Sequence, residues 1–572
     1  MRRRGLLTAL VLVALVAAAA ALIALPSSAP RVGHAGVGSS HRGSSPAIAA
    51  HAPKRIGRTD PARRIQVGLA LRLPNRQALD QFLKDVETPG SPHYREFLSA
   101  AEYARRFGAD ASDVAQLRSR LARRGFAVGA TKNQGTTLSV AGSVRLVGRT
   151  FGVQFDDYRD SEGHSYYQPV GKPRVPTELS RYVAEVGGLS NQPLQVSDVP
   201  DSGLTPVVTA KAYNIQPLYN AGFHGEGQTI AVVSPLSFKQ ADMDQYDREV
   251  LKDTGPRVER VPVNGGNDST SGGAAGEVAL DLQVIRGIAP KAQILNYESP
   301  EGLPPAQFFA DTYDQIVKDG RAKIVSNSYG VCELGASAGD QAIVDRAANA
   351  AVAAGISIFF ASGDAGAYDC QHANPTITEK VIDFPGGGDN HVNVGGTLVS
   401  VRQDNSYLEE QAWSSTIERA GTGGGISRFA KRPPWQTGPG VDNTDLNPDG
   451  GRQTPDVAGP ADPSSGFAIC QDGDCAGGHG GTSAAAPFWA AITALVAQYS
   501  KDQGTGELGY VNPVLYQLGT NPGKNPPFND VVHGNNRAYN ATPGWDFTTG
   551  WGTPNAANLA QSYVDYLKSQ KK

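Results

Sequence analysis

The sequence predicts an α/β fold, with a doubly wound, mainly parallel sheet in the larger, C-terminal part of the chain. From about residue 207 onward, short apolar strand-like segments alternate with helical segments. The strand candidates are apolar along their length, which indicates strands covered on both faces. The 572 residues, 40% hydrophobic and 19% charged, are enough for two or more globular domains. The strand candidates are TIAVVS, AQILNYE, KIVSNSYG and SIFFASG, and the helix candidates are GEVALDLQVIRGI, PAQFFADTYDQIVKDG and GDQAIVDRAANAAVAAG.

The N-terminal segment has the features of an export signal. Residues 2–4 are arginines, a long apolar run follows, and small residues lie near Ala29, so we expect residues 1–29 to be a signal peptide. The apolar run approaches membrane-spanning length, which leaves a membrane anchor at residues 5–25 as the alternative. Residues 30–62 are rich in Ser, Ala, Pro, Gly and His and predict a disordered linker. We therefore expect a secreted, extracellular protein.

Residues 63–190 predict a smaller folded unit ahead of the large one. Two strand–helix–strand passes in this stretch indicate an α/β sandwich of the ferredoxin-like type. Residues 191–206 are polar and contain prolines, so we expect a linker that is open to cleavage. The large domain then covers residues 207–572. The segments of the smaller unit are IQVGLALRL, RQALDQFLKDVE, ASDVAQLRSRLARRG, AVGAT, TTLSVAG, SVRLVGRTF and VQFDDY.

Charge and cysteine content narrow the possible classes of protein. The net charge of −3 gives no electrostatic basis for nucleic-acid binding. Four cysteines in an exported chain predict two disulfides with three possible pairings. The pair Cys470 and Cys475 is the easiest to close, and it leaves Cys332 with Cys370. Neither CxxC nor HxxxH spacing is present, which argues against a zinc site.

The segment GGHGGTSAAAP contains a candidate nucleophile, Ser483. The glycines before it permit a tight turn, and the helical segment after it is apolar almost all round. Pro487 is tolerated only near the first turn of that helix, so Ser483 is expected at or just before the helix start. Free amides and the helix dipole would there favour an alkoxide or oxyanion. A helix-capping serine is the other interpretation of this pattern.

The sequence has no obvious histidine base for this serine. None of its ten histidines precedes Gly-Thr, so a Ser-His-Asp triad lacks its middle member. Glu277 and Asp281 lie four residues apart on a predicted apolar helix and project from one face. Two acids in a low-dielectric cleft cannot both ionise easily, and the pair would share a proton and act as a base at acidic pH. An exposed, accidental pair is the alternative.

Asp364 is the third candidate. It follows the apolar strand SIFFASG at its carboxyl end, where sites gather in sheets of this type. A protonated Asp364 could donate a hydrogen bond to a developing oxyanion. A turn-forming aspartate would give the same local sequence.

Taken together, these residues resemble the sedolisin (serine-carboxyl peptidase) family, and in particular its kumamolisin-like members. The resemblance extends from about residue 63 to residue 557, and the smaller unit resembles the pro-kumamolisin activation domain. The matching segments are TPGSPHYREFLSAAEYARRFG, AYNIQPLY, GQTIAVV, GEVALDLQ, ASGDAGA, FPGGGDNHVNVGGT, GGGISRFAKRPPWQ, TPDVAGPADPSSGF, GGTSAAAP and GWDFTTGWGTP.

The resemblance implies a role for each candidate residue. Glu277 corresponds to the general base, Asp281 to its partner, Ser483 to the nucleophile, and Asp364 to the residue that completes the oxyanion hole. It also implies a subtilisin-like fold and an acid-acting endopeptidase that cleaves proteins or peptides. The enzyme would be a monomer, made as a zymogen whose own pro-domain is an intramolecular inhibitor and folding aid. Tyr329 stands where such members tend to have Trp, so side-chain preference is not transferred.

The resemblance further implies one structural calcium ion near the C-terminus. FNDVVHG and ATPGWDFTTG carry the family signature for it. Carboxylate and carbonyl oxygens suit a hard cation, and water would complete the shell. The family often has Gly at the position of Thr542, a change that a carbonyl ligand tolerates. The expected ligands are the carboxylates of Asp530 and Asp546 and the carbonyl groups of Val531, Thr542 and Gly544.

Three other functions are compatible with parts of the sequence. A histidine-dependent enzyme of the subtilisin type would tolerate loss of the Glu277 carboxylate. A non-catalytic scaffold with the same fold is the second, and a tripeptidyl exopeptidase of the same family is the third. The sequence does not show whether the cleft is closed at one end.

Overall fold

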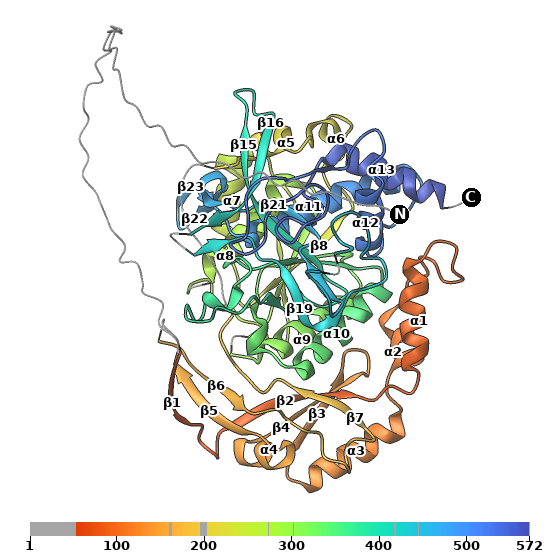
Figure 1. The fold of residues 1–572 in the computed structure, drawn as a ribbon, viewed down its shortest axis with the longest axis vertical. Helices are drawn as coiled ribbons and strands as arrows, with labels where there is room; N and C mark the ends of the chain where they lie inside the picture. Colours follow the sequence, from red (N-terminus) through yellow and green to blue (C-terminus); the bar gives the residue numbers. More distant parts are fainter. Residues whose placement is uncertain are drawn as a thin grey trace, which may run out of the picture. The chain divides into compact units, whose positions relative to one another are not determined.

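The computed structural model describes residues 53–159, 163–194, 203–272, 274–300, 302–416, 419–443 and 445–570. Figure 1 shows how these segments are arranged. The expected signal peptide or anchor, most of the linker at 30–62 and the centre of the linker at 191–206 lie outside the described residues. Within the described part of the chain, no helix has the length and apolarity needed to cross a membrane.

The smaller unit has a four-stranded antiparallel sheet in the order β3-β4-β2-β7. With helices α3 and α4 this is the strand order of a ferredoxin-like sandwich, which confirms the predicted type. Its core includes Leu69, Leu117 and Phe151, all fully buried. The elements are β2 (Arg64–Leu71), α3 (Ala111–Arg123), β3 (Ala127–Lys132), β4 (Thr137–Ser143), α4 (Val144–Phe151) and β7 (Val183–Gly187).

Two details of this unit differ from the sequence-based expectation. The VQFDDY segment forms β5 (Gln154–Arg159) in a separate sheet with β1 and β6 (Ser165–Val170), and β7 takes the fourth place in the main sheet. Strand β1 (Lys54–Arg58) lies inside the expected linker at 30–62. It is ordered by pairing with β5, where buried Asp156 binds Arg55 and Arg58. The composition of residues 30–62 gave no indication of this charge pairing, because its partners lie about a hundred residues apart in the sequence.

Two helices between β2 and α3 lie outside the core of the smaller unit: α1 (Arg76–Glu87) and α2 (Ala100–Phe107). Helix α2 begins with a capping box formed by Ser99 and Glu102. Residues from Ala50 onward belong to one compact unit, and α1 and α2 both contact a helix of the large domain, α10.

The large domain is built on an eight-stranded sheet in the order β16-β15-β13-β11-β8-β10-β9, with β21 also paired to β15. All pairings are parallel except that of β15 with β16, which confirms the doubly wound, mainly parallel prediction. The strands are β8 (Thr229–Ser234), β9 (Glu259–Pro262), β10 (Gln293–Glu298), β11 (Ile324–Asn327), β13 (Ser357–Ala361), β15 (Val392–Val401), β16 (Tyr407–Ala412) and β21 (Val457–Pro460).

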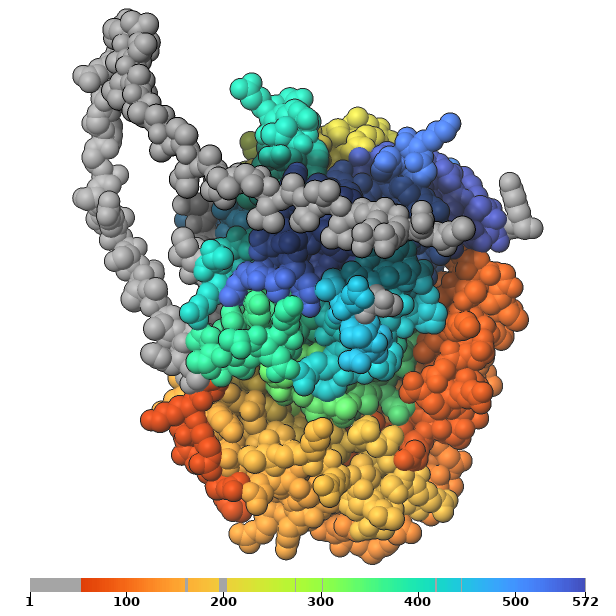
Figure 2. Space-filling view, viewed as in Figure 1, coloured from red at the N-terminus to blue at the C-terminus, as the bar shows by residue number. Residues whose placement is uncertain are grey.

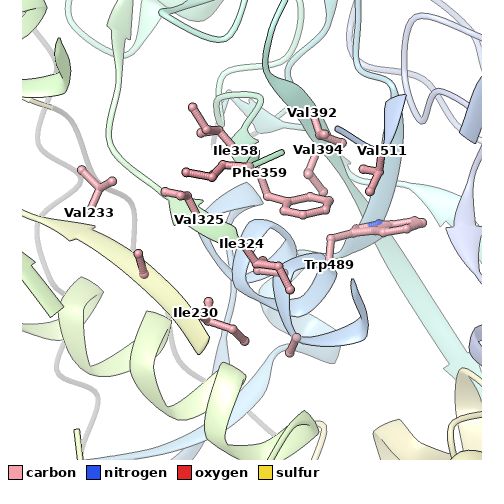
Figure 3. Close-up of a cluster of buried hydrophobic side chains, with 14 of the residues drawn as sticks. Ile230, Val233, Ile324, Val325, Ile358, Phe359, Val392, Val394, Trp489 and Val511 are labelled. Atoms are coloured by element: carbon pink, nitrogen blue, oxygen red, sulfur yellow. The ribbon is translucent and has the colours of Figure 1, made fainter. Parts of the chain in front are cut away.

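Two groups of helices cover this sheet. Helix α11 packs on α8 and α13, α9 packs on α10, and both groups contact β8. The core between strands and helix is filled by branched side chains from β8, β11, β13 and β15 and by Trp489 of α11, which stacks on Phe359 with ring centroids 6.4 Å apart (Figure 3). The helices are α8 (Ala275–Ile288), α9 (Pro305–Asp319), α10 (Ala338–Ala353), α11 (Thr482–Asp502) and α13 (Ala556–Ser569).

Shorter elements connect this framework. The helices are α5 (Pro206–Ala212), α6 (Gln216–Asn220), α7 (Gln240–Tyr246) and α12 (Asn512–Thr520), and the paired strands are β12 (Val331–Cys332) with β14 (Asp383–Phe384), β17 (Ser414–Ser415) with β18 (Ala420–Gly421), β19 (Gly425–Lys431) with β20 (Gly451–Thr454), β22 (Phe467–Gln471) with β23 (Asp474–His479), and β24 (Phe528–Asn529) with β25 (Thr553–Pro554).

Both disulfides form in the predicted pairing, in which the two cysteines nearest in sequence close a short ring. Cys470 pairs with Cys475 across the β22–β23 hairpin, and Cys332 pairs with Cys370. The hairpin is fastened to α8, because the Gln283 amide donates to the Cys470 carbonyl oxygen at 2.7 Å and accepts from the Cys470 amide at 2.6 Å. The two cross-links therefore stabilise the loops next to the candidate site.

Candidate active site

Ser483 is the second residue of helix α11, which confirms its predicted place at a helix start. The preceding Gly481 has φ +86°, a conformation that glycine adopts at no steric cost. Ser483 is only 4% exposed. The first amides of a helix lack intrahelical acceptors and lie at the positive end of its dipole. Negative charge on or beside this serine is therefore stabilised by its own helix.

Pro487 determines how the carbonyl group of Ser483 is satisfied. Proline has no N–H, so the carbonyl four residues earlier loses its helical donor. The Ser328 hydroxyl donates to this carbonyl oxygen at 3.1 Å, and the Ser483 hydroxyl donates to the Ser328 carbonyl oxygen at 3.4 Å. Ser328 directly follows β11. The end of a central strand is thus fastened to the helix that carries the candidate nucleophile.

The Ser328 hydroxyl also connects this serine to the acids of α8. Its Oγ lies 2.6 Å from Asp281 Oδ1, so its single proton can go to the carboxylate or to the Ser483 carbonyl, one at a time. Glu277 and Asp281 are 4% and 0% exposed. Burial raises the pKa of Asp281 well above its usual value. The buried acid pair on one helix is confirmed, and its catalytic role stays a prediction.

Tyr329 is a close neighbour of both acids. It is 1% exposed, and its pKa is raised well above the usual value, first by burial and then by the charges of Glu277 and Asp281. Its ring packs edge-on against Phe308. The residue therefore forms part of the wall behind the acid pair.

Asp364 lies beside the start of helix α11, which carries the candidate nucleophile. It follows β13 at its carboxyl end. Its Oδ1 accepts hydrogen bonds from the Thr482 amide at 2.8 Å and the Thr482 hydroxyl at 2.6 Å. Because Thr482 immediately precedes Ser483, these two bonds fix the Asp364 carboxyl next to the candidate nucleophile.

Three further buried acids surround Asp364, and the sequence analysis missed them. Asp369 Oδ1 packs so closely on Gly363 that a Cβ atom there would lie 2.4 Å away. Burial and the charge of Asp364 raise the pKa of Asp369 to about 8, and burial with the charges of Asp369 and Asp364 raises the pKa of Asp383. Burial raises the pKa of Glu333 to about 7.

The disulfide between Cys332 and Cys370 holds this cluster together. Glu333 and Asp369 are the direct sequence neighbours of these cysteines, and Asp383 pairs with Cys332 across two short strands. Acids adjacent to both half-cystines were the available sequence signal. The predicted pairing of Cys332 with Cys370 could therefore have brought Glu333 and Asp369 together from the sequence alone.

One histidine in the core is kept neutral by its surroundings. His391 is 0% exposed and lies between the rings of Tyr313 and Phe360. Burial, and next the charge of Arg452, lower the pKa of His391 to about 3. This residue belongs to the core beneath β15.

The candidate calcium ligands lie on two loops that meet. Asp530 Oδ2 accepts from the Gly544 amide at 2.9 Å, and Asp546 Oδ2 accepts from the Thr542 amide at 2.9 Å. Asp546 Oδ1 is held by Thr548 and Thr549. Burial raises the pKa of Asp546 to about 6. The set of two carboxylates and three carbonyls has the hard oxygen chemistry that suits calcium.

Comparison with known proteins decides the family. Residues 52–192 match the pro-kumamolisin activation domain, and residues 263–552 match the subtilase family. Over 538 residues the chain is 31% identical to kumamolisin from Bacillus sp. (strain MN-32), which covers 88% of this chain and 92% of that protein. The chain belongs to the sedolisin family. It is therefore a serine-type peptidase made as a zymogen.

Other members of the sedolisin family support this assignment. Sedolisin from Pseudomonas sp. (strain 101) is 26% identical over 518 residues, 86% of each chain. Tripeptidyl-peptidase 1 from Bos taurus is 25% identical over 549 residues, 89% of this chain and 93% of that one. The solved structure of Pseudomonas sedolisin with two molecules of pseudo-iodotyrostatin matches with a TM-score of 0.55 and 25% identity, and covers 64% of this chain and 98% of that chain.

Replacing Ser328 with Ala should lower kcat/KM for peptide cleavage. The change removes a hydrogen bond to a buried carboxylate and leaves the Ser483 carbonyl without its donor. A loss of about 1.5–3 kcal/mol of transition-state stabilisation corresponds to a rate lower by roughly 10- to 150-fold. Ser328→Thr should restore part of it. Ser326→Ala removes another buried serine hydroxyl, in β11 itself; it is the matched control and should keep full activity.

The buried acids predict that the folded protein is more stable at acidic than at neutral pH. Burial raises the pKa values of Glu333, Asp369 and Glu410 to about 7, 8 and 7. Their stabilising contribution is present below the unfolded pKa values, near 4, and is lost as the pH rises through about 7 to 8. For Glu410, moving the pKa from 4.5 to about 7 corresponds to roughly 3 kcal/mol.

Thermal unfolding of the Ser483→Ala protein, which lacks the candidate nucleophile, measures this stability from pH 3 to pH 9. The Tm should fall on the neutral side, and Glu410→Gln should flatten the slope. A Tm that rises steadily towards pH 8 would contradict the prediction.

Proposed function

We propose that the protein is a secreted, acid-acting serine-carboxyl endopeptidase, stabilised by calcium and activated by removal of its own activation domain. The observation that carries the proposal is the linked arrangement of Ser483, Ser328 and Asp281 on one side of the helix start, with Asp364 fixed on the other. This arrangement supplies a nucleophile, a buried acid pair and a carboxyl beside the reacting oxygen.

The proposed reaction begins with proton transfer from Ser483 to Glu277, which Asp281 supports. The Ser483 oxygen then attacks the peptide carbonyl carbon. Protonated Asp364 and the first amides of α11 donate hydrogen bonds to the oxyanion. The amine leaves with a proton returned from Glu277, and an acyl-enzyme remains on Ser483. Water attacks the ester as Glu277 accepts a proton from it; Glu277 then returns this proton to the departing Ser483 oxygen, which frees the acid product and restores the hydroxyl.

Acidic conditions suit each group in this scheme. The raised pKa of Asp281 means that the acid pair keeps one proton well above the pH at which a free aspartate loses it. Asp364 must carry a proton to donate, and its charge helps to raise the pKa values of the neighbouring Asp369 and Asp383, so these carboxyls resist being ionised together. As the pH rises and these carboxyls ionise, hydrogen-bond donation to the oxyanion is lost. The activity should therefore fall on the neutral side.

Activation is proposed to occur by cleavage between Leu194 and Gly203. Before this window, the Asn191 side chain accepts from the Tyr167 amide at 2.7 Å. After it, the Leu204 amide donates to the Gly466 carbonyl oxygen at 2.5 Å. Segments tied by such bonds are poor protease substrates. N-terminal sequencing of the acid-treated chain tests this, and a new terminus inside β8 would contradict it.

Export is proposed from the two disulfides together with the N-terminal sequence. Disulfides persist in oxidising compartments. The basic, apolar N-terminal segment would direct the chain there as a cleaved signal, with anchoring as the alternative.

Two candidates differ in where the substrate is cut. Kumamolisin gives the higher identity and favours an endopeptidase, while tripeptidyl-peptidase 1 matches over a similar length. Product masses from a long peptide distinguish them. Internal fragments support the endopeptidase, and successive tripeptides from one end support the exopeptidase.

Peptide cleavage should be highest at acidic pH and should need both Ser483 and Glu277. At every pH from 2 to 9, the rate of Ser483→Ala should be several orders of magnitude below that of the parent. The loss is large because removing one member of a catalytic unit costs about as much as removing the whole unit. Glu277→Gln should lose activity to a similar degree. Glu410→Gln is the matched control, because it removes a buried acid that has no part in the proposed reaction. This variant should stay active at low pH.

The same assay separates the rival mechanisms. An active Glu277→Gln enzyme with a neutral or alkaline optimum would favour a histidine base. An active Ser483→Ala enzyme would overturn the proposed nucleophile.

Calcium should stabilise the fold through the loops at 530–531 and 542–546. Only the folded state offers the five oxygens together, so free calcium at 100 times Kd should add about 2.7 kcal/mol. Thermal unfolding of Ser483→Ala should show a lower Tm after chelation and recovery with calcium. Asp546→Asn should remove the calcium response. A Tm that ignores chelation would contradict the site.

A further inference from the structure

Two loops that are far apart in the sequence meet beside the candidate active site. The first loop, residues 365–371, directly follows Asp364. The second loop, residues 534–540, lies between the two segments that carry the candidate calcium ligands. In Figure 2, blue surface from the C-terminal part of the chain adjoins green surface from the middle of the sequence. The Ala367 amide donates to the Asn536 carbonyl oxygen at 3.0 Å, so the backbones of the two loops are in direct contact.

Arg537 is the side chain with which the second loop holds the first. Its Nη1 donates to the carbonyl oxygens of Ala365 and Arg419, both at 2.9 Å, and its Nη2 donates to Gln371 Oε1 at 2.6 Å. The guanidinium also lies over the ring of Tyr368, 5.4 Å from the ring centroid. The N–H groups of an arginine form a rigid, planar fork. This one group therefore holds the first loop at its first residue, in its middle and at its last residue.

The backbone at Arg537 shows that this side chain is held there at a cost. Its φ is +75°, which glycine adopts freely and other residues adopt rarely. Within the described residues Arg537 makes no ion pair, and burial, followed by the charge of Arg419, lowers the pKa of its guanidinium. Strained residues persist where the surrounding structure fixes them, and they gather at functional sites. The contacts with the first loop are what this residue supplies in return.

The contact with Ala365 bears directly on the position of Asp364. The Asp364 carboxyl is fixed by Thr482, and its own carbonyl oxygen accepts from the Gly421 amide at 2.8 Å. Arg537 binds the next carbonyl along the chain. A group that donates to an oxyanion has to lie about 2.7–3.1 Å from it. A misplacement of about 1 Å can lower a reaction rate about 100-fold.

We propose that Arg537 is a positioning residue, which fixes the main chain after Asp364 so that the Asp364 carboxyl stays within hydrogen-bond distance of the oxyanion. Arg537 touches no reacting atom in the proposed reaction and acts only through Asp364. The inference rests on the proposed role of Asp364, and it adds to the site a residue that lies outside the four predicted positions.

The kinetic test compares the acid-activated parent with Arg537→Gly in calcium-containing buffer. Glycine removes the contacts and relieves the backbone, so the variant should fold with a Tm close to that of the parent. Its kcat should be about 10- to 100-fold lower. KM should change little, because the lost interaction serves only the transition state. Unchanged kcat, or a raised KM with unchanged kcat, would overturn the inference.

Two further variants make this comparison specific. Arg537→Lys keeps the charge but not the planar fork, so it should recover only part of the lost kcat. Arg419→Ala is the matched control, because it removes an exposed arginine side chain beside Arg537 and leaves the carbonyl group that Arg537 binds. This control should match the parent.

A double-mutant cycle tests whether Arg537 acts through Asp364. In an Asp364→Ala protein, adding Arg537→Gly should lower kcat no further, because residues that act as one unit are not additive. An additional tenfold loss in that background would mean that Arg537 acts independently of Asp364, and this would overturn the inference.

Hydrogen exchange gives a readout that needs no peptidase activity. In the Ser483→Ala protein, the amides of residues 365–371 should exchange about tenfold faster or more when Arg537→Gly is added, because local opening depends on the contacts that close a segment. Adding Arg419→Ala should leave exchange unchanged. Equal exchange in both variants would overturn the inference. An active Ser483→Ala enzyme would overturn the proposed function and leave this measurement unaffected, so the two proposals fail separately.

Discussion

The carbonyl group of Ser483 is the constraint on which the arrangement of the site depends. Pro487 deprives it of a helical donor, and a buried carbonyl without a partner costs free energy. Ser328 supplies the donor, and the same hydroxyl reaches Asp281. The Ser328 hydroxyl, which replaces the N–H that Pro487 lacks, therefore connects strand β11, helix α8 and helix α11. Because all three meet at the carboxyl end of the parallel sheet, the connection also fixes where the site can be.

Burial of carboxyl groups is the second feature that runs through the molecule. Asp281, Asp369 and Glu410 have raised pKa values for the same reason, since charge is disfavoured in a low dielectric. At acidic pH these groups are neutral and can be buried at little cost. At neutral pH, each must either ionise in an apolar environment or hold its proton at a cost in free energy. A fold that contains Asp281, Asp369, Asp383 and Glu410 in its interior is therefore expected to be more stable at acidic than at neutral pH, independently of the reaction it performs.

Periodicity was enough to predict the sheet and the helices, but not the contacts between distant segments. TIAVVS and SIFFASG became β8 and β13, because strands covered on both faces need apolar side chains at every position. Strand β1 was missed since its order comes from Asp156, about a hundred residues away. In the same way, VQFDDY has the pattern of a strand, and no local feature indicates which sheet it joins.

The site could be predicted in part for a similar reason. The four predicted site residues stand in segments whose local pattern is unusual for their residue type: Ser483, Glu277, Asp281 and Asp364. The structure brings Ser483, Asp281 and Asp364 to the start of α11. Ser328 lies in KIVSNSYG, where a serine at a strand end has no distinguishing context. Its importance arises only from the neighbour that Pro487 leaves unsatisfied. Residues that act through another residue carry no signal of their own in the sequence.

Helices α1 and α2 show that the boundary between activation domain and peptidase is not the boundary between two cores. Both helices belong to the activation domain by sequence, but five of their apolar side chains belong to the core of the peptidase: Leu79, Phe82, Val86, Tyr103 and Phe107. An apolar side chain is stabilised wherever it is removed from water, whichever domain its backbone belongs to. Separating the two domains would therefore expose part of the peptidase core to water.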